Sequence, residues 1–208
     1  MRPARLAPLT GVAAGLLGLL AIATAGSGRP SSGAPGSSVI SFYATHGSRQ
    51  HASDVLAIGA LVFLVLFAAV LAAQLAAAPR ALPLLILASA VIAALGGMIV
   101  FSLDYGLTDV AGNLPDYEAQ GLNSVVNLLF VPLLIGTAML ALSCGMAIVR
   151  APVVPRWLGW GAIAIGVLGC TPAFFAALIA LLVWVMAVGT LLFASPPVTR
   201  QDAAPAGA

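Results

Sequence analysis

Long uncharged apolar stretches, separated by short polar segments, make up most of this chain. The clearest runs from Leu122 to Val149, 28 residues without a charged side chain, with acidic residues before it and arginines after it. At about 1.5 Å per residue, a helix of that length is longer than a hydrocarbon core of about 30 Å requires. The run therefore predicts a membrane span that reaches into both interfaces or crosses at a tilt.

The same pattern predicts six membrane-spanning helices in all. Pro79 and Arg80 end one apolar run, and Pro83 suits the first turn of the next. The last uncharged run would extend about 55 Å as a single helix, so we divide it at Cys170-Thr171-Pro172. The fold class is therefore all-α, a polytopic membrane protein. The predicted spans are Leu6–Ala25, Val55–Ala78, Leu82–Leu103, Leu122–Val149, Trp157–Cys170 and Ala173–Ala194.

The first segment, residues 1–26, allows two interpretations. Ala23-Thr24-Ala25 has the small-x-small form of a signal-peptide cleavage site. Gly11, Gly15 and Gly18 instead suit a retained helix that packs closely against its neighbours. We favour the retained helix, and a cleaved signal peptide stays the alternative.

The segment before the second span is predicted to be an outer loop with a short interfacial helix. Residues 27–38 are rich in Gly, Ser and Pro, which indicates a mobile loop. Apolar residues at i, i+1, i+3 and i+4 of 39–43 predict a helix along the interface. Ser53 or Asp54 is placed to cap the second span. The organisation is then 1–26 first transmembrane helix, 27–54 outer loop, 55–195 five-helix membrane region and 196–208 disordered cytoplasmic tail.

Composition agrees with a bilayer as the solvent. The chain is 62% hydrophobic and 7% charged, so it cannot cover itself with a water-soluble surface. A net charge of +2, with no lysine, also argues against nucleic acid as a partner. With both termini in the cytoplasm, most arginines fall on the inner side, as the positive-inside rule requires. The inner set is Arg2, Arg5, Arg80, Arg150, Arg156 and Arg200, and the outer set is Arg29 and Arg49.

The two cysteines, Cys144 and Cys170, are not expected to pair. In the six-span topology they lie about 12 Å apart along the membrane normal, beyond the roughly 7 Å Cα separation that a disulfide tolerates. We interpret both as small buried residues.

Three groups of outer polar residues are candidate sites. His46, His51, Asp54 and Asp104 offer imidazole and carboxylate ligands for zinc or another transition metal, although their spacing matches no standard metal motif and favours loop polarity and capping. A second group, of acidic residues, could collect calcium or pair with Arg49, but a solvated loop is favoured. Asn123 and Asn127 could line a polar entrance, but hydrogen bonding between helices is favoured. The acidic group is Asp104, Asp109, Asp116 and Glu118.

Several motifs that particular functional classes require are absent from the sequence, and this disfavours those classes. No ionisable side chain lies in the six predicted cores, which disfavours a coupled pump. We find no phosphate loop, no paired-cysteine redox motif and no nucleophile with its base, so an enzyme is disfavoured and no catalytic residue or cofactor is expected. We therefore expect a structural, accessory or sensory protein of the cytoplasmic membrane, with a membrane protein or a second copy of this chain as a possible partner. A passive transporter or channel, and an enzyme using the outer His/Asp residues, are the alternatives.

One resemblance accompanies this interpretation. The segment Pro155-Arg156-Trp157-Leu158-Gly159-Trp160, followed by Gly161 and Gly166, resembles an uncharacterised family of six-span bacterial membrane proteins, a domain of unknown function. Phe42-Tyr43 ahead of Arg49 is similar to the first outer loop of that family. The resemblance implies the six-span fold and no activity.

Overall fold

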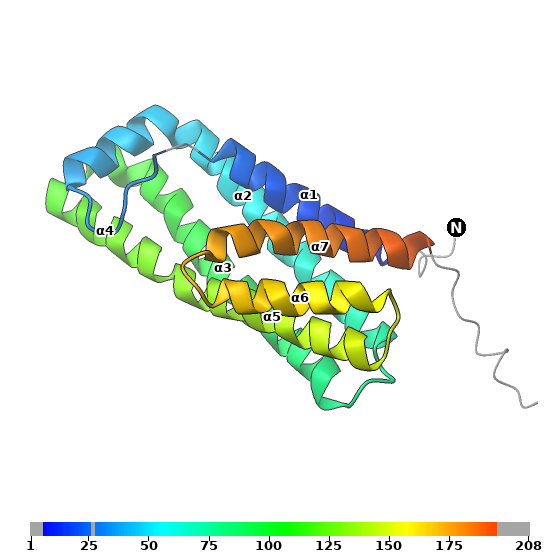
Figure 1. Cartoon of the computed structure of the whole chain (residues 1–208). Helices are drawn as coiled ribbons and strands as arrows, with labels where there is room; N and C mark the ends of the chain where they lie inside the picture. Colours follow the sequence, from blue (N-terminus) through cyan, green and yellow to red (C-terminus); the bar gives the residue numbers. More distant parts are fainter. Residues whose placement is uncertain (1–5, 26–27, 195–208) are drawn as a thin grey trace, which may run out of the picture.

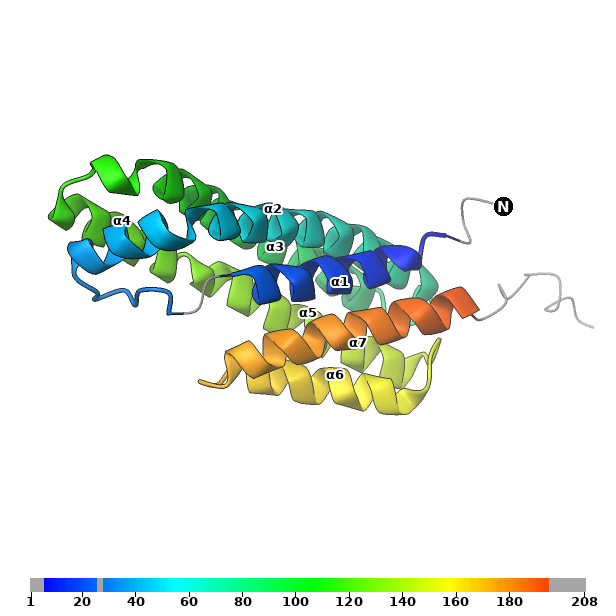
Figure 2. The ribbon, with the colours of Figure 1, turned by 90° about the horizontal axis from the view of Figure 1, so that it is seen from above.

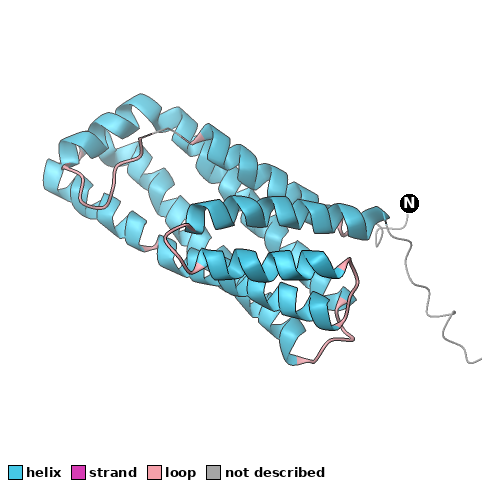
Figure 3. Ribbon diagram, viewed as in Figure 1, coloured by secondary structure: helices cyan, strands magenta, loops and turns pink. Residues whose placement is uncertain are grey.

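The computed structural model describes residues 6–25 and 28–194, which form helices joined by short connections, with no strand among them (Figure 3). The all-α prediction is confirmed. The predicted tail at 196–208 lies outside the described residues, as do Arg2, Arg5 and Arg200. The elements are α1 (Leu9–Thr24), α2 (Gly36–Gln74), α3 (Ala81–Val110), the 3-10 helix η2 (Ala111–Asn113), α4 (Asp116–Leu128), α5 (Phe130–Arg150), α6 (Arg156–Gly169) and α7 (Phe174–Ala194).

Six of the helices pack as a closed ring. Each contacts the next in the order α1, α2, α3, α5, α6 and α7, and α7 returns to α1. Figures 1 and 2 show α1 beside α7, and α4 with the first part of α2 extending well beyond the turn between α6 and α7. One apolar core draws side chains from all six ring helices, and a second, smaller core joins α2, α3 and α4 in this extension.

The helices have the length and composition of membrane spans. Among the described residues, four helical stretches are long and apolar enough to cross a bilayer: 36–74, 81–113, 116–150 and 174–194. The apolar α1 is shorter, with 16 residues, and α6 has 14. Large apolar side chains such as Leu84 and Leu95 are 66% and 58% exposed on the outside of the bundle, where a soluble protein would place polar ones. The chain is therefore a helical protein of the membrane type.

The helix α2 is longer than predicted. It runs unbroken through 39 residues, about 58 Å, so residues 39–43 form its first turns and no separate interfacial helix. Ser53 and Asp54 lie in its interior and cap nothing. The prediction failed because the polar residues between 44 and 54 resemble a loop in sequence, whereas here they remain helical and several pack against α3.

The outer ends of α3 and of the fourth predicted span also differ from expectation. The helix α3 continues to Val110, so Asp104 is helical and does not begin a loop. Helices α4 and α5 are separated by a break at Leu129. Pro132 explains the break, because it has no N–H to donate to the carbonyl of residue 128 one turn earlier.

Glycines allow the ring helices to approach closely. A Cβ atom on Gly15 of α1 would lie 2.7 Å from the carbonyl oxygen of Leu182 on α7. A Cβ atom on Gly136 of α5 would lie 2.4 Å from the backbone nitrogen of Ala93 on α3. Neither contact leaves room for a side chain, so the predicted role of the α1 glycines in close packing is confirmed.

Three exposed arginines lie at one end of the bundle. Arg80 between α2 and α3, and Arg150 and Arg156 flanking the turn between α5 and α6, are exposed at the end of the bundle where α1 begins and α7 ends (Figure 1). The acidic residues of α4 lie at the opposite end.

The two cysteines are both free, as predicted. Cys144 is buried, but Cys170 is exposed, so the prediction of two buried cysteines is wrong for the second. Cys170 follows the last residue of α6, where the chain turns toward α7.

Candidate functional site

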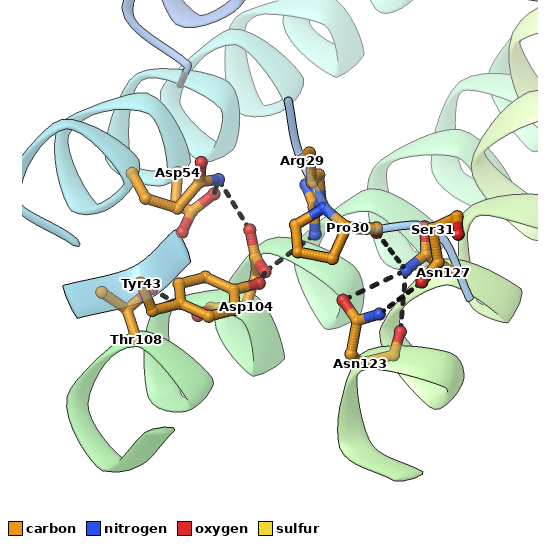
Figure 4. A network of polar contacts seen from close by, with 10 residues as sticks. Arg29, Pro30, Ser31, Tyr43, Asp54, Asp104, Thr108, Asn123 and Asn127 are labelled. Atoms are coloured by element: carbon orange, nitrogen blue, oxygen red, sulfur yellow. Dashed lines mark hydrogen bonds and ion pairs between the residues drawn. The ribbon is translucent and has the colours of Figure 1, made fainter. Parts of the chain in front are cut away.

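A cluster of buried polar side chains lies where α2 and α3 leave the apolar core. Tyr43, Gln50 and Asp54 follow one another at seven and four residues along α2, so they share one face of that helix. This face meets Asp104 of α3. Asp54 and Asp104 are both fully buried, and Arg29 enters from the segment before α2 (Figure 4).

Asp104 is the centre of the cluster. Its Oδ1 accepts from Nη2 of Arg29 at 2.8 Å and from the hydroxyl of Tyr43 at 2.5 Å. Its Oδ2 accepts from Nε2 of Gln50 at 2.6 Å, and the same nitrogen donates to Oδ1 of Asp54 at 3.1 Å. Three donors from two segments therefore hold one carboxylate, which satisfies its lone pairs away from water.

The cluster retains two unsatisfied polar atoms. Within the described residues, Oδ2 of Asp54 and Nε of Arg29 are buried without a hydrogen-bond partner. The cluster also holds two carboxyl groups and only one guanidinium, so the charge of Arg29 is already matched by Asp104. Natural proteins leave few buried polar atoms unpaired, and such atoms point to a function or a missing partner.

Residues 28–35, which we call the strap, connect α1 to α2 across the outer end of the ring. Nδ2 of Asn123 donates to the carbonyl of Ser31 at 2.8 Å, and the hydroxyl of Ser124 donates to the carbonyl of Ser32. The guanidinium of Arg29 lies 5.4 Å from the ring centre of Phe130, a cation–π distance. The strap is therefore tied to α3, α4 and α5. Asn123 hydrogen-bonds to this strap rather than to another helix.

A cavity of about 450 Å³ lies inside the ring, below the strap. Its volume falls within the roughly 300–1,000 Å³ typical of small-molecule sites. Helices α1, α2, α5 and α7 supply most of its wall, which is mainly apolar. The polar groups of the wall lie mostly at the outer end, where Arg29, Gln50 and Asn127 line it. Thr137 is also polar, but its hydroxyl donates to the carbonyl of Leu134 in its own helix.

The cavity has an apolar mouth. Four of its lining residues are also well exposed on the outside of the bundle: Ile22, Val131, Phe175 and Ile179. They come from the end of α1 and from the first turns of α5 and α7, on the outer side of the turn where α6 ends and α7 begins. A mouth bordered by such side chains suits hydrocarbon better than water.

The inner half of the ring is filled. Leu71, Leu75, Ile86 and Ile148 are fully buried there and belong to the main apolar core. The cavity ends above these side chains, near Leu64 of α2.

The four residues predicted as metal ligands do not form one group. Asp54 and Asp104 lie together in the cluster. His51 lies 3.1 Å from a carboxylate oxygen of Asp109, and His46 stacks on Phe42 at 4.8 Å. Across the part of the chain that the structure describes, no group of three or more His, Cys, Asp or Glu side chains is placed to hold a metal ion. Metal binding by these residues stays a prediction.

Sequence reasoning missed three members of the site. Tyr43, Gln50 and Arg29 were not predicted as site residues, and the acid at position 104 pairs with Arg29 instead of Arg49. The seven-residue and four-residue spacing of Tyr43, Gln50 and Asp54 was the available signal. It is meaningful only if residues 43–54 are helical, which the sequence pattern did not indicate.

Comparisons of the chain with protein-family models, with curated proteins and with solved structures find no match. The site must therefore be interpreted from its own chemistry.

Proposed function

We propose that this chain is a six-span protein of the cytoplasmic membrane, with an accessory or sensory role that depends on binding a membrane-dissolved apolar molecule inside the ring. The observation that carries the proposal is the 450 Å³ cavity with its apolar mouth at the end of α1 and the first turns of α5 and α7. Such a mouth admits a molecule from the bilayer, because exposed apolar side chains at membrane depth contact lipid.

The topology in this proposal has both termini inside. Counting α1 and α6 as spans gives six crossings and leaves Arg80, Arg150 and Arg156 on one side, which supports the positive-inside arrangement. Because α1 forms part of the cavity wall, we also favour its retention over cleavage as a signal peptide. Membership of the uncharacterised six-span family belongs to the same proposal. A reporter active only in the cytoplasm should give signal after Ala208 or near Arg80, and silence at both would refute this topology.

Binding is favoured over transport because the inner half of the ring is packed. A passive transporter needs a path that continues past Leu64, where buried leucine and isoleucine side chains now lie. Solute flux into vesicles containing the purified protein separates the two functions. Flux above that of protein-free vesicles would favour the transporter.

The binding test uses an alkane that carries a photoactivated diazirine, with the protein in lipid nanodiscs. Ala60 lines the cavity, whereas Ala69 on the same helix is exposed outside it. We expect Ala60→Phe to fill the cavity and lower labelling of the mouth residues on α1 and α7, and Ala69→Phe to leave it unchanged. Equal labelling in wild type and both variants would refute the proposal. Thermal unfolding of each variant checks that the fold is kept.

A further inference from the structure

The cavity is amphipathic along its length, and its two ends differ in chemistry. Arg29, Gln50 and Asn127 line the outer end, and Leu64 lines the far end. From Gln50 to Leu64 the helix α2 rises about 21 Å. Half of a hydrocarbon core is about 15 Å, so the cavity covers the depth of one membrane leaflet together with its interface.

The guanidinium of Arg29 has hydrogen-bond donors to spare. Only its Nη2 donates to a described protein atom, and that atom belongs to Asp104. An arginine carries five N–H donors. The side chain is 25% exposed, and it lines the cavity. A ligand in the cavity that places an oxygen acceptor at this end would therefore meet unused donors.

The charge balance of the cluster selects against a charged head group. Arg29 is already neutralised by Asp104 at 2.8 Å, and Asp54 adds a second buried carboxyl nearby. An anionic head would bring an unmatched negative charge into this partly buried site, and removing a charge from water without a partner is costly. A cationic head would meet the guanidinium. A neutral acceptor, such as an ester carbonyl or a hydroxyl, has neither disadvantage.

The volume and the mouth of the cavity limit the size and shape of the apolar part of the ligand. The cavity of about 450 Å³ runs along α2 from Gln50 to Leu64, and its exposed lining residues are Ile22, Val131, Phe175 and Ile179. This shape suits one hydrocarbon chain lying parallel to the helices. Because the mouth opens in the same half of the bundle as the strap, a molecule of the outer leaflet can reach it in the proposed topology.

We propose that the cavity binds a single-chain amphipath with an uncharged, hydrogen-bond-accepting head, taken from the outer leaflet. This inference rests on the proposed function and adds the class of ligand. The head lies against Arg29, Gln50 and Asn127, and the chain extends toward Leu64.

The experiment uses three compounds of equal chain length in the same nanodiscs: a monoacylglycerol, the corresponding fatty acid at a pH where it is ionised, and the alkane without a head. Each is used with a diazirine as a probe and without one as a competitor. We expect unlabelled monoacylglycerol to compete with the monoacylglycerol probe about tenfold more effectively than either alternative, since a hydrogen bond to a charged donor is being gained. Cross-links should map to α1, α5 and α7.

The controls separate the two proposals. Ala60→Phe should lower cross-linking by all three probes, and Ala69→Phe by none. If the three probes compete equally but Ala60→Phe still blocks them, the ligand class is wrong and the binding function stands. If Ala60→Phe has no effect on any probe, the binding function itself fails. Stronger competition by the fatty acid would also overturn the uncharged head.

A second variant tests Arg29 without removing its ion pair. Arg29→Lys keeps a positive charge beside Asp104 but lacks the planar set of donors. We expect it to remove the advantage of the monoacylglycerol over the alkane, with little change in alkane labelling. An unchanged preference for the monoacylglycerol would show that Arg29 does not hold the head.

Discussion

Replacing Asp104 by asparagine should destabilise the protein strongly, because this carboxylate joins three segments. It accepts from Arg29, Tyr43 and Gln50 at 2.8, 2.5 and 2.6 Å, and it is fully buried. An asparagine keeps the size of the side chain. It offers one acceptor oxygen where two stood, turns an NH₂ group toward donors, and leaves Arg29 without its counter-charge.

The size of the stability loss follows from the burial of Asp104 and Arg29. Removing one member of a buried ion pair costs about 3–5 kcal/mol, and the 25% exposure of the Arg29 side chain places this pair near the lower end. At about 2–4 °C per kcal/mol for a chain of this length, a loss of about 3 kcal/mol lowers the melting temperature by roughly 6–12 °C.

The assay is thermal unfolding in detergent micelles, followed by tryptophan fluorescence. Asp109→Asn is the matched control, because Asp109 lies on the same helix with its side chain 59% exposed. That exposed contact with His51 should contribute at most about 1 kcal/mol. The double variant Arg29→Gln/Asp104→Asn should cost less than the sum of the single changes, with a coupling of about 1–3 kcal/mol. Shifts of equal size for Asp104→Asn and Asp109→Asn would refute the reasoning.

Three further predictions test the packing, the exposed cysteine and the strap. Gly136→Ala should destabilise by about 1–3 kcal/mol, because its Cβ would lie 2.4 Å from the backbone of Ala93, whereas Gly161→Ala, with open space around it, should be neutral or stabilising in the same unfolding assay. Cys170 should react with a maleimide in the folded protein and Cys144 only after unfolding; labelling of Cys144 at the same rate would contradict the buried position. Asn123→Ala should release the carbonyl of Ser31 and increase protease cleavage within the strap, while Gly121→Ala, in open space on the same helix, should leave the cleavage rate unchanged.

Much of the architecture could be predicted from the sequence, because a bilayer imposes a simple rule. Every backbone polar group within hydrocarbon must be satisfied locally, so long apolar runs become helices whatever their neighbours are. Prolines then mark where these helices stop: Pro79 precedes α3, Pro155 precedes α6, and Pro172 lies between α6 and α7. The glycines of α1 likewise predicted that this helix packs closely against its neighbours.

The outer third of the molecule was decided by tertiary contacts. Between residues 44 and 54 the sequence carries histidine, arginine, glutamine and aspartate, which indicate a solvated loop when considered alone. In the fold, this stretch stays helical because Tyr43 and Gln50 both donate to Asp104 on α3, and Gln50 also donates to Asp54. A local pattern cannot reveal such partners, since Gln50 and Asp104 are 54 positions apart in the chain.

The sequence by itself determined the bilayer environment of this protein, its helical class and most of its helix boundaries. These follow from the length of the apolar runs and from the need of the backbone for hydrogen bonds. The closing of six helices into a ring decided the cavity, its apolar mouth and the pairing of Arg29 with Asp104. These depend on which helix faces which and on how closely glycines let them approach, and that information exists only once the side chains of distant segments meet.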